Sequence, residues 1–239
     1  MKSMGAKIHK ALIKINEKTI LENVVMSLAD EGIKDHIIAV GYRNKSIKKV
    51  LNQYKNLNFK FIYIKEYKTR GSSFSLFKAS KFCLEYKKIL MIHADIFFDK
   101  KLLTKVIEAK RSNVLGFVKK NYKTIKNKGF VIKFNKKNKI NKLDFKKNFD
   151  EKINSEITCI NKFSNEKLKK IRESLKKYFH NENAKQTWEV PFNQFIQKNN
   201  EEFYAAGLKN KFWFNINTKQ ELNHARKFCL NRLNIKKFF

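Results

Sequence analysis

Two charged residues, Lys10 and Asp95, stand where they could act on phosphate groups. Lys10 opens the apolar segment 11–15, and its ammonium is a compact cation able to contact phosphate oxygens from a strand edge. Asp95 follows the apolar run 89–92, so its carboxylate would end a buried strand, where a hard oxygen ligand can bind Mg²⁺ beside phosphates. The alternatives are a solvated lysine and an aspartate that caps the next turn. The residues alone leave both alternatives open.

The elements that must position these residues alternate between strand and helix. The predicted strands are 10–15, 35–40, 59–64 and 88–93, the last buried on both faces, and the predicted helices are 19–29, 46–54 and 73–82. This order predicts an α/β protein with a mostly parallel, doubly wound, Rossmann-like sheet. Ligands of such sheets bind beyond the carboxyl ends of the strands, so Gly41, the loop 70–73 and Asp95 should face one crevice.

The rest of the chain adds more strands and then helices. Further predicted strands are 129–134, 140–145 and 155–162, of which the first two form a hairpin, and further helices are 165–179 and 189–197. A capping box at Thr218 and Glu221 begins the last helix. With 239 residues, one proline and seven glycines, we expect a single domain spanning 1–239. Within it, 113–162 forms an inserted strand region at the substrate end.

The formal net charge of +33 would ordinarily suggest nucleic acid or an anionic membrane as a partner. The lysines are spread along the whole chain, as solvated faces are, so we expect no nucleic-acid partner and only a general attraction for phosphorylated ligands. We find neither an apolar run of the roughly 18 residues that a membrane span needs nor a signal-peptide core, and we expect a cytoplasmic protein. The three cysteines and five histidines lack metal-ligand spacing, which predicts buried thiols.

The order of these signals resembles the nucleoside-triphosphate nucleotidyltransferases, which activate sugar phosphates, phosphocholine or related phosphomonoesters. The matching pieces are residues 10–12 for the family's Pro-Lys-Ala-Leu, 19–22 at the start of the first helix, 40–42, 75–76, 94–95 for its Gly-Asp, and 213–218 for its Trp-x-Glu-Ile-Asp-Thr. Residues 75–76 and 188–189 are more similar to the phosphocholine and aminoethylphosphonate cytidylyltransferases than to the hexose-phosphate enzymes. The resemblance therefore favours CTP as the nucleotide.

This resemblance implies transfer of a nucleotidyl group, CMP above others, from a nucleoside triphosphate to a small phosphomonoester such as phosphocholine or a sugar phosphate. Pyrophosphate would be released, Mg²⁺ would be the cofactor, and the product would serve cell-surface polysaccharide or lipid decoration. By the same resemblance, Lys10 and Asp95 are catalytic, Asp95 binds the metal, and Asn217 stands at a second metal ligand's place. Implied nucleotide contacts are Lys2, Ser3, Gly5, Gly41, Ser72 and Ser73, and implied substrate contacts are Glu156 and Glu189.

Three departures separate the chain from the family pattern. Only residues 2–5 resemble the tail of the family's glycine-rich phosphate loop, with Ser3 in place of its arginine. We expect the missing opening strand and loop to be encoded upstream of Met1, or the gene to be truncated. His9 replaces the family's proline, and Asn215 and Asn217 stand where the family has a glutamate and its second metal aspartate. An amide oxygen can bind a metal but brings no charge.

Two alternatives remain open on the sequence. One is a catalytically degenerate relative that binds a nucleotide weakly or acts as an interaction protein, which the missing loop, Asn215 and Asn217 favour. The other is a nucleotide-sugar glycosyltransferase with the same sheet topology. Such enzymes usually carry two acids spaced Asp-x-Asp, whereas residues 93–95 contain only Asp95.

Overall fold

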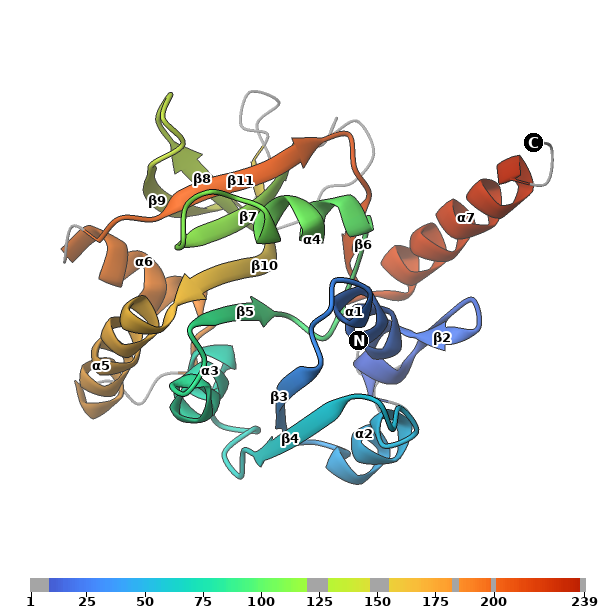
Figure 1. The fold of residues 1–239 in the computed structure, drawn as a ribbon, viewed down its shortest axis with the longest axis horizontal. Coiled ribbons are helices and arrows are strands. Elements are labelled where there is room, and N and C mark those ends of the chain that lie inside the picture. Colours follow the sequence, from blue (N-terminus) through green and yellow to red (C-terminus); the bar gives the residue numbers. More distant parts are fainter. Residues whose placement is uncertain (1–8, 120–128, 147–154, 182–184, 199–200, 237–239) are drawn as a thin grey trace.

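The computed structural model describes residues 9–119, 129–146, 155–181, 185–198 and 201–236 (Figure 1). It is an α/β fold, as predicted, in which a six-stranded sheet and smaller two-stranded sheets pack among helices. Three of the expected nucleotide contacts, Lys2, Ser3 and Gly5, lie outside these ranges. Within them, no helix combines the length and the apolar character needed to cross a bilayer.

The start of the described chain differs from the predicted strand 10–15. η1 (Lys10–Leu12) is a short 3₁₀ helix. It forms here because Nδ1 of His9 accepts a hydrogen bond from the backbone N–H of Ala11 at 3.2 Å and so caps the turn. Lys10 therefore lies on a capped turn and not at the edge of a strand.

A hairpin and the first long helix follow this turn. β1 (Lys14–Ile15) pairs antiparallel with β2 (Lys18–Thr19). Thr19 and Glu22 then form a reciprocal capping box at the start of α1 (Ile20–Asp30). The predicted helix 19–29 is thus confirmed, and it buries one apolar face.

A small parallel sheet forms from the next two strands. β3 (Asp35–Val40) pairs in parallel with β4 (Asn58–Tyr63), and α2 (Asn44–Leu51) connects them. Both predicted strands are confirmed, while the helix begins earlier than predicted. α2 buries Ile47 and Leu51 in the apolar cluster that also contains residues of α1.

The larger sheet is mixed rather than mostly parallel. Its order is β11 (Tyr204–Lys209), β7 (Val114–Lys119), β10 (Glu156–Ser164), β8 (Gly129–Phe134) and β9 (Ile140–Lys146), and β5 (Lys88–Ile92) also pairs with β10. Among the described pairings of this sheet, only β11 with β7 is parallel, and β10 runs antiparallel to β5, β7 and β8. The β8–β9 hairpin is confirmed. β7 and β10, which we expected in an inserted region, are inner strands of this sheet.

Helices and one further strand pair complete the fold. They are α3 (Ser72–Ser80), η2 (Lys81–Cys83), α4 (Lys100–Ile107), α5 (Asn165–Asn181), α6 (Glu189–Lys198), α7 (Lys219–Lys236), and the antiparallel pair of β6 (Ile96–Phe98) with β12 (Trp213–Asn215). The large core includes Phe163, Trp188 and Phe192. The predicted capping box before α7 is confirmed, and α7 extends away from the body of the molecule in Figure 1.

Candidate functional site

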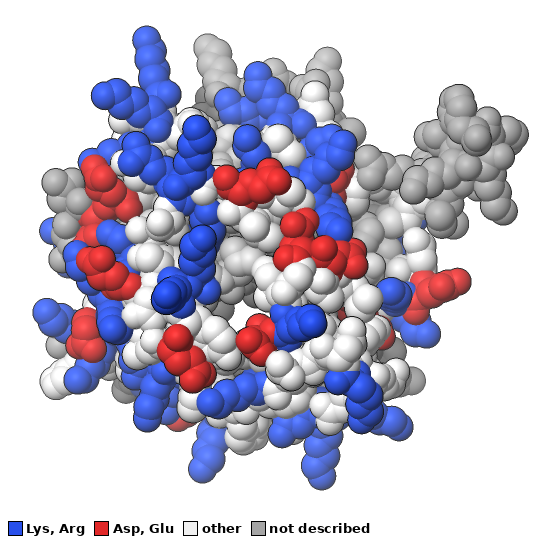
Figure 2. Space-filling view, in the orientation of Figure 1, with Lys and Arg blue, Asp and Glu red and all other residues white. Residues whose placement is uncertain are grey.

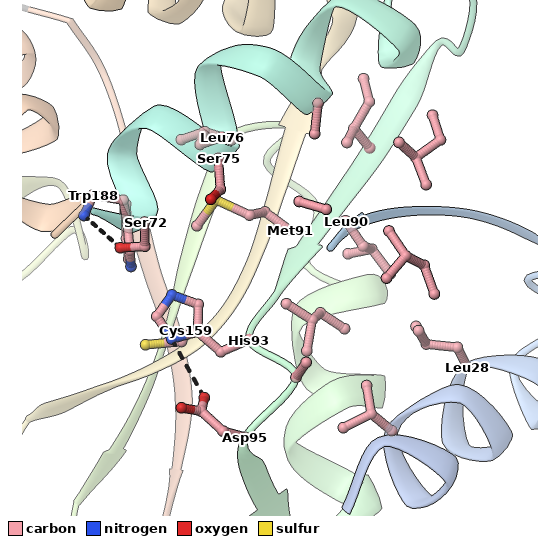
Figure 3. A pocket seen from close by; sticks show the side chains of 18 of the residues that line it. Leu28, Ser72, Ser75, Leu76, Leu90, Met91, His93, Asp95, Cys159 and Trp188 are labelled. Carbon is pink, nitrogen blue, oxygen red and sulfur yellow. Dashed lines mark hydrogen bonds and ion pairs between the residues drawn. The ribbon is translucent and has the colours of Figure 1, made fainter. Parts of the chain in front are cut away.

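A cavity of about 1090 Å³ lies beyond the carboxyl ends of β3 and β5 and continues between these strands. Its walls come from far-apart parts of the chain, which Figure 3 shows around Asp95, Trp188 and Leu28. Residues 89–92 of β5 are only half-buried, contrary to the prediction, because they face this space. On the visible surface, basic side chains are spread among acidic ones and are not gathered into one patch (Figure 2).

Lys10, Asp95 and Asn217 meet on the cavity wall. The ammonium of Lys10 forms an ion pair with the carboxylate of Asp95 and donates a hydrogen bond to Oδ1 of Asn217 at 3.0 Å. The Lys10 side chain is 33% exposed and the Asp95 side chain 15%, so the pair is partly shielded from water but still reachable. The structure thus brings together three residues that the sequence placed in separate segments.

Backbone hydrogen bonds fix the approach of these segments. The N–H of Ile216 donates to the carbonyl of Asp95 at 3.1 Å, directly beyond the β6–β12 pairing. On the other side, the N–H of Asn217 donates to a carboxylate oxygen of Glu221 at 2.7 Å. Glu221 also receives the N–H of Thr218, so the capping box of α7 orients Asn217 toward the cavity.

The electrostatics of this centre favour an ionised Asp95 and a neutral His9. Burial alone would raise the pKa of Asp95, but the charge of Lys10, then that of His93, and the Lys10 hydrogen bond bring this pKa below its ordinary 3.8. Nδ1 of His93 lies 3.8 Å from Asp95. Burial first, and then the neighbouring Lys10 charge, lower the pKa of His9. The centre therefore carries one carboxylate charge balanced by one ammonium at neutral pH.

A neighbouring part of the cavity wall, which we call the acidic end, is acidic and aromatic. Glu156 and Glu189 are both 6% exposed and line it, as does Trp188. Oε2 of Glu189 is buried and has no hydrogen-bond partner in the described part of the chain, while its Oε1 lies 4.0 Å from the sulfur of Cys159. Burial first, and then Glu189, Asp95 and Glu156, raise the pKa of Cys159 well above 9.0. Negative charge thus concentrates around this thiol.

The expected nucleotide contacts have different surroundings. Ser72 lines the cavity, and its hydroxyl accepts a hydrogen bond from the N–H of Trp188 at 3.0 Å (Figure 3). Ser73 is fully buried and donates its hydroxyl to the carbonyl of Gln186 at 2.8 Å, so it positions this loop and does not line the cavity. Gly41 is covered by Tyr67, whose Cβ would lie 2.5 Å from a Cβ at that glycine.

Sequence reasoning missed two residues of the site. His93, two positions before Asp95, packs edge-to-face against Trp188 and points toward the carboxylate (Figure 3). Its position directly after β5 and close to Asp95 could have indicated a place in the site. Cys159 stands at an irregularity of β10 with φ 57°, a left-handed conformation for which the sequence gives no sign. The sulfur of Cys159 lines the cavity beside Glu189.

The ion pair of Lys10 and Asp95 lies beyond strand ends of an α/β fold, which is where ligands of such sheets bind. The chain belongs to the nucleotidyl transferase family, whose model matches residues 3–231. No curated protein sequence matches it. Within the described residues, no group of three or more His, Cys, Asp or Glu is arranged to hold a metal ion.

Solved structures share this fold at low sequence identity. CTP:phosphocholine cytidylyltransferase (LicC) from Streptococcus pneumoniae has a TM-score of 0.74 at 16% identity, covering 92% of this chain and 89% of that chain. The inositol-1-phosphate CTP transferase from T. maritima has a TM-score of 0.74 at 15% identity, covering 92% and 85%. HddC from Yersinia pseudotuberculosis has a TM-score of 0.66 at 17% identity, covering 95% and 92%.

Proposed function

We propose that this chain transfers CMP from CTP to a small phosphomonoester whose head group is positively charged, such as phosphocholine. An oxygen of the substrate phosphate attacks the α-phosphorus of the nucleotide, a new P–O bond forms, and the bond to the leaving pyrophosphate breaks. The observation that carries the proposal is one cavity lined both by Lys10 and Asp95 and by the buried carboxylate of Glu189 next to Trp188. The low-identity likeness to two CTP-dependent enzymes supports the choice of nucleotide.

The chemistry depends on positioning and on charge neutralisation, because negative charge crowds around the reacting phosphorus. Lys10 lines the cavity on a flexible side chain, so its ammonium can turn from Asn217 to a phosphate oxygen without movement of the backbone. We assign Lys10 to stabilise the charge that develops on the phosphates. Its capped position on η1 keeps the side chain directed at the cavity.

Mg²⁺, when bound, would neutralise and orient the triphosphate. Asp95 and Asn217 would hold it, and they fit a cation because their oxygens already converge on one cationic group, the ammonium of Lys10. This donor set carries a single negative charge. The remaining oxygen ligands that Mg²⁺ prefers would come from phosphates and water.

The acidic end of the cavity suits a cationic head group. A buried carboxylate oxygen without a hydrogen bond, as at Glu189, is costly unless a ligand supplies positive charge or a donor. Trp188 adds an aromatic ring, which attracts alkylammonium groups through its π face. Glu156 adds a second carboxylate to the same wall. Together they support an amine or quaternary ammonium in preference to a neutral sugar.

Pyrophosphate release by the full-length chain tests the proposal, with CTP, MgCl₂ and phosphocholine as the first mixture. Other triphosphates and glucose 1-phosphate then measure the preference for each substrate. Asp95→Asn should abolish release, whereas Lys49→Met, which removes an exposed lysine of α2, should leave it unchanged. The proposal would be overturned if no combination of triphosphate and substrate released pyrophosphate and calorimetry also detected no binding of CTP.

A second candidate is a nucleotide-binding protein without catalysis. The amide of Asn217, where a second carboxylate would strengthen a metal site, favours it. This candidate would be selected over the first if calorimetry showed magnesium-dependent binding of CTP while no combination of triphosphate and substrate released pyrophosphate.

A further inference from the structure

Segment 185–188, which leads into α6, is tied by hydrogen bonds to the start of α3. The N–H of Trp188 donates to the hydroxyl oxygen of Ser72 at 3.0 Å (Figure 3). The hydroxyl of Ser73 donates to the carbonyl of Gln186 at 2.8 Å. Two neighbouring serines of α3 therefore hold this segment at two points.

The starts of the two helices cap each other. The carbonyl of Gln186 also accepts the N–H of Ser73 at 3.4 Å, and so satisfies one of the donors that the first turn of a helix leaves without an intrahelical partner. In return, Ser72 accepts the N–H of Trp188, whose own carbonyl accepts the N–H of Phe192 in α6. This reciprocal arrangement fixes where α6 begins relative to α3.

The backbones of the two segments are also in close contact. A Cβ at Gly71 would lie 1.8 Å from the carbonyl oxygen of Gln186. Farther along the same loop, Nζ of Lys185 donates to the carbonyl of Lys68 at 3.0 Å. A displacement of segment 185–188 must therefore break these contacts or carry the loop before α3 with it.

This segment ends on side chains of the acidic end of the cavity. Trp188 is 1% exposed and packs edge-to-face on Phe192 and His93, at ring-centroid distances of 5.2 and 6.3 Å. Glu189 follows directly and lines the same cavity. Because the backbone sets the direction in which a side chain leaves it, holding the N–H of Trp188 orients both Trp188 and Glu189.

We propose that Ser72 and Ser73 are positioning residues that set the affinity for the phosphomonoester rather than for the nucleotide. This role rests on the proposed function and differs from the nucleotide contacts that the sequence implies for both serines. Ser73 is fully buried and acts through Gln186, and Ser72 acts through Trp188. Without these bonds, Trp188 and Glu189 would have to be ordered each time a cationic head group binds, which lowers its affinity.

Steady-state kinetics of pyrophosphate release test this role. Ser72→Ala and Ser73→Ala should each raise the KM for phosphocholine about five- to tenfold, and should leave the KM for CTP within about twofold. Ser72→Thr keeps the hydroxyl and should restore the KM for phosphocholine to within about twofold. Ser27→Ala is the control, because it removes a half-buried hydroxyl that donates to a carbonyl within α1 at 2.8 Å. An equal rise in both KM values would overturn the proposal.

Amide hydrogen exchange of Trp188, followed by NMR, tests the positioning without catalysis. Trp188 is buried and its N–H is bonded to Ser72, so Ser72→Ala should speed this exchange at least about tenfold. Ser72→Thr and Ser27→Ala should leave it within about twofold. An unchanged rate in Ser72→Ala would overturn the positioning role. If the unmodified chain released no pyrophosphate from any combination of triphosphate and phosphomonoester, the proposed function would fail, and the exchange rate would decide the positioning of Trp188 by itself.

Discussion

The ammonium of Lys10 donates a hydrogen bond to the amide oxygen of Asn217 at 3.0 Å, although the two residues are 207 positions apart in the sequence. The same ammonium pairs with Asp95, so one cation joins η1, the end of β5 and the turn before α7. In this arrangement the ammonium of Lys10 contacts both of the side chains that we propose as metal ligands, Asp95 and Asn217. Any ligand that binds here must draw the ammonium away or share these oxygens with it.

Lys10→Met should lower kcat/KM for the proposed reaction by a factor on the order of 10²–10³, because it removes a cation that stabilises transition-state charge. Loss of the ammonium should also raise the pKa of Asp95, since the charge of Lys10 is the main influence that lowers it. Steady-state kinetics measure the first effect, and NMR titration of the carboxylate measures the second. Unchanged kcat/KM would remove Lys10 from the mechanism, and Lys49→Met is the control.

Asn217→Asp should strengthen binding of Mn²⁺, used as a probe for Mg²⁺, on the order of tenfold, about 1.4 kcal/mol. The physical reason is a second carboxylate on the oxygens that now converge on Lys10. Asn223→Asp adds the same charge at an exposed position of α7 and controls for general attraction. Electron paramagnetic resonance of free Mn²⁺ measures the affinity. Equal gains in the two variants would show that residue 217 is not a metal ligand.

Glu189→Gln should raise the KM for phosphocholine about tenfold or more and leave the KM for an uncharged sugar phosphate within about twofold. Glutamine keeps the shape of the buried side chain but removes the charge that would attract a cationic head group. The ratio of the two KM values is therefore the informative quantity. A parallel rise in both would indicate that Glu189 supports the fold of the cavity and not its selectivity.

Gly71→Ala should destabilise the protein by more than about 2 kcal/mol, as overpacking does. A Cβ there would lie 1.8 Å from the carbonyl oxygen of Gln186, so the loop that carries Trp188 must move. Gly32→Ala is the matched control, since its Cβ would meet no atom within 4 Å. Its φ of 78° is nevertheless strained for alanine, at about 1 kcal/mol. Urea unfolding measures both, and similar losses would refute the steric explanation.

The Gly71 geometry also illustrates what the sequence could not predict. The φ of Gly71 is −90°, which other residues also adopt, so the close approach of distant backbone explains the glycine. Such an approach depends on tertiary packing, which local patterns do not encode. The same holds for β10, whose strand was predicted but whose antiparallel return through the sheet was not.

Local signals predicted other parts of the site well. The apolar run before Asp95 indicates where a strand ends, and the capping box after Asn217 indicates where a helix begins. These two points lie side by side in the structure. Lys10 lies beside Asp95 on a 3₁₀ turn and not on the predicted strand, because capping by His9 outweighs the apolar pattern there. The bulge at Cys159 had no local signal at all.

His36→Leu should make the protein less sensitive to mild acid. Burial lowers the pKa of His36, with Asp35 opposing this, and no described group bonds its Nε2. Because the pKa of this histidine is lower in the folded than in the unfolded protein, the unfolded state binds a proton at a higher pH than the folded state does. Stability is therefore independent of this group above about pH 6.5 and falls as pH drops toward the folded pKa. Asp95 does not contribute in this window, because its lowered pKa affects stability only below about pH 3.9.

Urea unfolding at pH 7.5 and pH 5.0 measures the effect of this substitution. The loss of stability between these values should be smaller in His36→Leu than in the unmodified chain, but not zero, because burial lowers the pKa of His9 in the same direction. His224→Gln, at an exposed position of α7, is the control and should retain the full loss. A loss in His36→Leu as large as that of the unmodified chain would show that His36 is protonated equally in the folded and unfolded states.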